Sequence, residues 1–226
     1  MKITKTILVG SMIALGFSAC IKHEIIPAPE PKVELVCHFN GLISGTPLEL
    51  TQNVKGYMME TNKSIFVPPA GLATATYYSE MKSAEDLVSV KISIGNMRWD
   101  GNGTDGPPSN VFNSFFTNNL IPNYTTGAIS TPTNTAGVEV AYRDGLGNIW
   151  LTKEVDDATN TMEFSNISQE TDKTGDYSKY IANFNCRVYH TFREIIQYPA
   201  PTPNDTIYTE ESFEITNAVL KGWYKR

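Results

Sequence analysis

Residues 87–95 read Leu-Val-Ser-Val-Lys-Ile-Ser-Ile-Gly, and this stretch decides the fold class. Apolar and polar side chains alternate with a period of two, which is the pattern of a β-strand with one buried face. We expect the aliphatic members to point into the core: Val88, Val90, Ile92 and Ile94. We expect the polar members to face solvent: Ser89, Lys91 and Ser93.

The same period recurs on both sides of this segment. It predicts strands at 73–78, 161–167 and 177–191, a hairpin over 137–152 that turns at Asp144–Gly147, and a closing pair at 206–216 and 219–224. Glycines in the turn supply the positive φ that tight hairpins require. Many short strands at this spacing predict an all-β chain, folded as an antiparallel β-sandwich (Ig-like or jelly-roll type) or as a barrel.

One segment departs from this period. Residues 107–120 carry apolar side chains at positions 111, 112, 115, 116 and 120, which is helical spacing. We therefore predict one short helix near 110–120, with Ser109 as its N-cap. Its apolar stripe is expected to plug an open end of the sheet rather than to bind a ligand.

The chain has three cysteines: Cys20, Cys37 and Cys186. The alternation places Cys37 and Cys186 on apolar strand faces, and in an oxidising compartment such a pair forms a disulfide. Two buried free thiols are the alternative. A metal site with His38 and His190 is disfavoured, because adjacent strand residues such as Cys37 and His38 face opposite ways, and we expect no metal.

The first residues are typical of a secretory leader. Lys2 and Lys5 precede an apolar stretch too short for a stable membrane span, so we expect residues 1–19 to be a removable signal peptide. No later apolar run approaches the ~18–20 residues of a spanning helix.

Residues 121–136 are rich in Thr, Pro, Asn and Gly and could divide two domains. A Cys37–Cys186 bond would join the two halves, so we expect one β-rich domain over 33–226.

Residues 17–20, Phe-Ser-Ala-Cys, resemble the lipobox of bacterial lipoproteins, in the looser form found in the Bacteroidota. The resemblance implies that Cys20 is acylated and anchors the chain in the outer membrane, where several lipid chains hold stably. Residues 20–32 contain closely spaced prolines and predict an extended tether. Lys22 and Glu24 partly resemble a surface-export signal, which favours the cell surface over the periplasmic face.

The hairpin carrying Tyr142, Asp144, Gly147 and Trp150 and the closing segment 213–223 are similar to segments of β-rich outer-membrane lipoproteins of the Bacteroidota. This resemblance implies an envelope role, such as glycan capture, adhesion or service as an accessory subunit.

The net charge of −6, without a basic run, excludes ordinary nucleic-acid binding.

The sequence shows no reactive constellation. It lacks the GxSxG, HExxH and phosphate-loop motifs, and the lone His190 is expected to be a satisfied, partly buried residue. Residues 100–106 look like a calcium loop, but Asp105 and Val111 stand where an EF-hand needs Gly and Glu. A solvated turn is expected there and at Asp156–Asp157, with an irregular calcium loop as the alternative at both places. We therefore expect that the protein is not an enzyme and that it uses no cofactor.

Three functions are weighed. The leading hypothesis is a non-catalytic, lipid-anchored interaction or accessory subunit of an outer-membrane complex. The second is a surface glycan-binding lipoprotein that uses Trp99 and Tyr124, aromatic residues beside polar loops, although Trp99 could instead cover the end of its strand. The third is a glycoside hydrolase, for which the sequence offers four carboxylates: Glu80, Glu85, Glu163 and Glu170. Separately, Asp205-Thr-Ile207 resembles a Bacteroidota O-glycosylation site, with Thr206 as acceptor.

Overall fold

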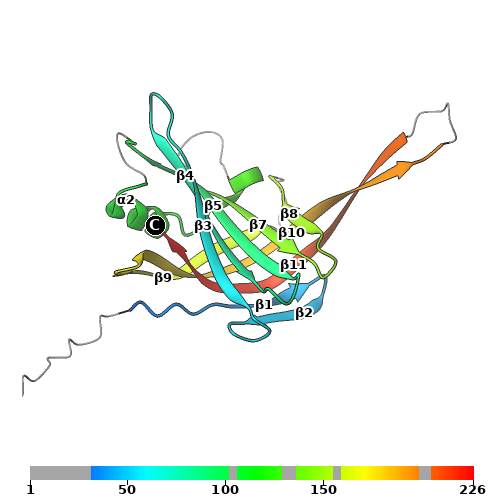
Figure 1. Ribbon diagram of the computed structural model, residues 1–226, viewed down its shortest axis with the longest axis horizontal. Helices are drawn as coiled ribbons and strands as arrows, with labels where there is room; N and C mark the ends of the chain where they lie inside the picture. Colours follow the sequence, from blue (N-terminus) through cyan, green and yellow to red (C-terminus); the bar gives the residue numbers. More distant parts are fainter. Residues whose placement is uncertain (1–31, 102–105, 129–135, 155–158, 199–204) are drawn as a thin grey trace, which may run out of the picture. The chain divides into compact units, whose positions relative to one another are not determined.

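The computed structural model describes residues 32–101, 106–128, 136–154, 159–198 and 205–226, and residues 32–226 form one compact unit. The expected all-β class is confirmed (Figure 1). The strands are β1 (His38–Ile43), β2 (Thr46–Thr51), β3 (Met58–Phe66), β4 (Ala73–Lys82), β5 (Ser89–Trp99), β6 (Asn123–Tyr124), β7 (Gly137–Arg143), β8 (Ile149–Thr152), β9 (Thr161–Asp172), β10 (Gly175–Ile196) and β11 (Asp205–Lys225). The helices are α2 (Ser109–Asn118) and the 3-10 turn η1 (Thr126–Ala128).

All the strands belong to one curled sheet that forms a half-barrel (Figure 1). Its order is β2-β1-β11-β10-β8-β7-β5-β4-β3, and every neighbouring pair on this path is antiparallel. Two strands lie off the path: the two-residue β6 runs parallel to β7, and β9 pairs with β10. The sheet therefore forks along β10, which pairs with β9 over 175–185 and with β8 at 188–189.

Strand β5 has the predicted inner face. Val90, Ile92 and Ile94 are fully buried, while Val88, the fourth residue predicted to point inward, lies just before β5 and is half-buried. Ser89 and Ser93, predicted to face solvent, are buried as well. Ser89 donates a hydrogen bond to Glu80, whereas at the Ser93 end of the strand η1 covers the outer face. The cover is tight, since a Cβ on Gly95 would lie 1.9 Å from the carbonyl oxygen of Ala128. The segment that could have divided two domains thus packs, as far as residue 128, onto the sheet.

The predicted helix is present as α2, and its stripe packs into the core. Phe112 and Phe116 are buried, with the Phe112 ring 5.3 Å from Tyr77 and the Phe116 ring stacked 4.8 Å from Tyr224. The N-cap, however, is Pro108 and not Ser109. The Ser109 hydroxyl instead donates a hydrogen bond to Asp176 at 2.8 Å, which ties the helix to the start of β10.

The closing pair of strands predicted at 206–216 and 219–224 is in fact one strand, β11. Asn217 interrupts the alternation, because it adopts a positive φ of 51° where the register with β10 shifts between Phe184 and Cys186. This is a β-bulge, which adds a residue to one strand without ending it. Strand β10 also continues past the predicted residue 191, to Ile196.

The packing of α2 gives a prediction for stability. Phe116→Ala should lower the free energy of unfolding by about 3–5 kcal/mol, because a ring stacked inside the core is replaced by a cavity. Phe115→Ala, on the half-buried side of the same helix, should cost about half as much or less. Urea unfolding followed by tryptophan fluorescence measures both changes. Equal losses for the two variants would contradict the role of α2 as a core plug.

Candidate functional site

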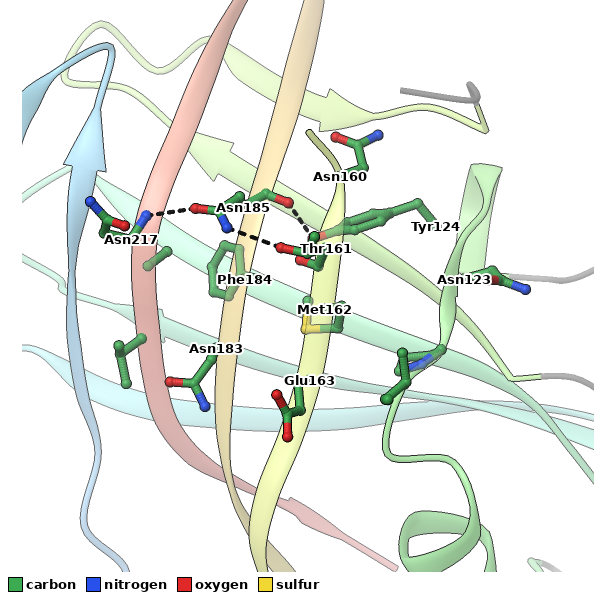
Figure 2. A pocket seen from close by; sticks show the side chains of 14 residues that line it. Asn123, Tyr124, Asn160, Thr161, Met162, Glu163, Asn183, Phe184, Asn185 and Asn217 are labelled. Carbon is green, nitrogen blue, oxygen red and sulfur yellow. Dashed lines mark hydrogen bonds between the residues drawn. The ribbon is translucent and has the colours of Figure 1, made fainter. Parts of the chain in front are cut away.

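A groove of about 760 Å³ lies over β9, β10 and β11, beside the segment that leads into β6 (Figure 2). We name it the amide groove, because asparagines dominate its lining: Asn123, Asn160, Asn183, Asn185 and Asn217. Its other residues include Thr161, Glu163 and Tyr124, together with the apolar Ile121, Pro122 and Val219. Among the described residues, no Lys or Arg lines it.

The strand register builds the floor of the amide groove. Asn185 lies opposite Thr161, while Asn183 lies between Glu163 on β9 and Val219 on β11. These residues alternate with buried neighbours such as Phe184, so their side chains point away from the core. The groove is therefore a polar outer face of three adjacent strands.

Two of the asparagines satisfy backbone groups that the sheet leaves unpaired. At the bulge, the Asn185 Oδ1 accepts the Asn217 backbone N–H at 2.8 Å, while its Nδ2 donates to Thr161 Oγ1 at 3.0 Å (Figure 2). Past the fork, Asn160 Oδ1 accepts the Arg187 backbone N–H at 2.9 Å. Unpaired backbone groups are costly when partly buried, so these amides hold the floor in place.

Tyr124, predicted from the sequence as a binding residue, lines the groove beside the first residue of β9. Its hydroxyl lies 3.1 Å from the Thr161 carbonyl oxygen and 3.3 Å from that of Asn185, and donates to them. Burial raises the pKa of Tyr124 well above its ordinary value, and the adjacent Cys186 raises it further. Tyr124 is thus a neutral hydrogen-bond donor that fixes β6 to β9 and β10.

The remaining polar groups of the floor keep free hydrogen-bonding capacity. Asn183 Nδ2 reaches only Ser165 Oγ, at 3.4 Å. The side chains of Asn217 and Glu163 are exposed and make no hydrogen bond with the described residues. These three groups are available to a ligand.

The structure places the other predicted binding residue, Trp99, outside the amide groove. Trp99 ends β5 opposite Ala73 and is only 4% exposed. Its ring covers the strand end and offers no surface for stacking a sugar.

The four candidate glutamates do not converge. Glu163 lies in the groove, whereas Glu80 accepts a hydrogen bond from Ser89 at 2.7 Å and Glu170 pairs with Lys179 at 2.5 Å. Glu85 lies in the loop between β4 and β5. The groove thus brings together no pair of these carboxylates.

The expected disulfide is not formed: Cys37 and Cys186 are free, buried thiols. The register explains why, since Cys186 lies opposite Ile215, while His38, next to Cys37, lies opposite Lys221. Residues 215 and 221 are roughly 20 Å apart on a strand that rises about 3.3 Å per residue. A disulfide needs Cα atoms within about 7 Å. The alternation placed both cysteines on apolar faces but carried no information on their distance.

The remaining sequence candidates divide into placed and unplaced residues. His190 is the satisfied residue predicted, with Nδ1 2.8 Å from the Ile149 carbonyl oxygen and its ring 5.3 Å from Trp150. Thr206 is half-buried near the start of β11, opposite Ile195, and its glycosylation stays a prediction. Outside the described residues lie the leader with Cys20, most of the 100–106 loop, and Asp156–Asp157. Within the part that the structure describes, no three His, Cys, Asp or Glu residues gather to hold a metal ion.

Comparison with protein-family models, with curated proteins and with solved structures finds no match for this chain. In the described ranges, no helix combines the length and apolarity needed to cross a membrane.

Sequence reasoning missed the asparagines of the amide groove. Asn183 and Asn185 do stand out within the strand 180–188, because asparagine is depleted in strands. That signal marks an irregularity in the sheet. It does not reveal that Asn160 and Asn217 come to the same place.

The two kinds of asparagine predict different costs. Asn185→Ala should destabilise the protein by about 1–1.5 kcal/mol, because the bulge N–H of Asn217 and the hydroxyl of Thr161 each lose a hydrogen-bond partner. Asn183→Ala, one pleat away on the same face, should change stability by no more than about 0.5 kcal/mol. Thermal unfolding followed by circular dichroism compares them, and equal effects would contradict the structural role of Asn185.

The thiols give a chemical test. Burial raises the pKa of both Cys37 and Cys186 above the ordinary thiol value. Since the thiolate is the reactive form, neither should react with a maleimide in the native protein, and both should react in denaturant without any reductant. Mass spectrometry of the peptides reads the labels. Resistance in denaturant that reductant relieves would show that the disulfide does form.

Proposed function

We propose that this chain is a non-catalytic, lipid-anchored envelope protein that serves as an interaction or accessory subunit of an outer-membrane complex. The observation that supports this proposal most directly is the far end of the β10–β11 hairpin. We name as the arm residues 191–196 of β10 together with residues 205–210 of β11. The arm projects away from the remainder of the sheet (Figure 1).

The arm has no third strand among the described residues. Pairing of β10 with β8 ends at Tyr189, and pairing of β11 with β1 ends at Ile215. Within the arm the two strands pair only with each other, in six pairs from Thr191↔Glu210 to Ile196↔Asp205. An ion pair from Lys153 to Glu210 fastens the base of the arm.

Both faces of the arm expose apolar surface. Ile207 and Tyr208 are consecutive on a strand, so their side chains lie on opposite faces, with exposed fractions of 43% and 66%. Ile195, on the other strand, is 48% exposed. A two-stranded ribbon is marginally stable alone in water, and open strand edges invite pairing. A protein surface that covers the arm would bury these side chains and pair its edges.

The anchoring part of the proposal depends on the sequence. The leader, the lipobox-like segment ending at Cys20 and the proline-rich tether would hold the unit 32–226 beside the outer membrane. Cell-surface exposure follows from the partial export signal and is proposed with it. The hydrolase alternative gains no support from the amide groove, where Glu163 is the single carboxylate of the four candidates.

The arm gives a direct test of the interaction. The double variant Ile207→Thr/Tyr208→Thr removes the apolar surface while keeping a residue that favours strands. Tagged, lipidated protein would be recovered from gently solubilised native envelope, and its partners would be identified by mass spectrometry. We expect wild type to bring down an envelope protein in stoichiometric amount. The double variant should bring down at least about tenfold less of that protein, because an apolar anchor is removed.

The control is Leu146→Thr, which removes an 87% exposed leucine from the turn between β7 and β8. It should retain the partner at the wild-type level. Recovery of wild type alone, or equal retention by the arm variant and the control, would contradict the proposal.

A further inference from the structure

We infer that the amide groove is a binding site for a neutral carbohydrate chain. The inference concerns the outer face of β9–β11, a different surface from the arm, and it stands whether or not the arm binds a protein. The volume of the amide groove, about 760 Å³, falls in the range of about 300–1,000 Å³ that is typical of small-ligand sites.

The free groups of the floor match hydroxyls. Each amide of Asn183 and Asn217 presents donors and an acceptor side by side without charge, and each sugar hydroxyl likewise both donates and accepts. Glu163, on β9 directly opposite Asn183, adds a pure acceptor. Vicinal hydroxyls of a sugar ring can therefore be bound from two adjacent strands at once.

The charges of the groove disfavour other small ligands. Without Lys or Arg in the lining, a phosphate or sulfate group would meet only amides and the Glu163 carboxylate. A cation would find one exposed carboxylate, which is too little to hold it. A neutral ligand suits the groove best.

An extended peptide is also disfavoured. Peptides commonly bind a sheet by adding a strand at an open edge. Here the edge of β9 is occupied at Phe164, whose backbone N–H donates to the Leu120 carbonyl oxygen at 2.7 Å. At this point of the groove β9 offers no free backbone donor for a peptide strand, whereas a carbohydrate can be held by the side chains of the floor.

Apolar surface borders the polar floor. Ile121 is 77% exposed on the rim, and Val219 is half-buried beside Asn183. Aliphatic contacts of this kind suit the C–H faces of a sugar ring. The floor is also rigid, since Asn185, Asn160 and Tyr124 fasten the strands, and little ordering remains to oppose binding.

The test uses two substitutions that keep the backbone intact. Asn183→Ala removes one amide, and Asn217→Gly removes the other while glycine accepts the positive φ of the bulge. The matched control is Asn62→Ala/Asn166→Gly. Asn62 is exposed on β3, and Asn166 has the same φ of 51° in the bulge of β9, both outside the groove.

The probe is an array of oligosaccharides with neutral members (glucose, mannose, galactose and N-acetylglucosamine chains) and sialylated and sulfated members. Titration calorimetry on bound members follows. We expect wild type and the control to bind at least one neutral chain with equal affinity, and the groove variant to bind it roughly tenfold more weakly. Binding of no neutral chain, binding of acidic chains only, or equal affinity of the groove variant and the control would overturn the inference.

Discussion

The structure depends on how β10 changes partners. This strand pairs with β9 up to Asn185 and with β8 from Val188, while β11 bulges beside it at Asn217. A strand that loses one neighbour before gaining the next leaves backbone donors and acceptors unpaired, and unpaired groups of this kind are costly where water is excluded. The sequence meets this constraint locally, with the side chains of Asn185, Asn160 and Tyr124.

Both functional proposals follow from that junction. Polar side chains bond the unpaired backbone groups where β10 changes partners, and they hold this face of the sheet rigid. Asn183 and Glu163 lie on the same face, beside them, with hydrogen-bonding capacity left over. Past the junction, β10 and β11 keep only each other, so the same hairpin that supports the groove ends as an arm with exposed Ile207 and Tyr208. The two proposed surfaces thus share strands β10 and β11.

Local patterns in the sequence predicted local structure well. The alternation in 87–95 and the helical spacing of Phe112 and Phe116 each report a periodicity that packing preserves, and the glycine-containing turn gave the β7–β8 hairpin. What failed needed information from distant segments. The burial of Ser93 depends on η1, which covers it from elsewhere in the chain, and the separation of Cys37 from Cys186 depends on the strand register.

Hydrogen–deuterium exchange, measured on the purified protein and again within native envelope, tests the account most directly. The backbone amides of Arg187 and Asn217 should exchange slowly in both states, because Asn160 and Asn185 hold them. The arm should exchange fast in the purified protein and become protected within the envelope. Fast exchange at Arg187 and Asn217, or an arm equally unprotected in both states, would contradict it.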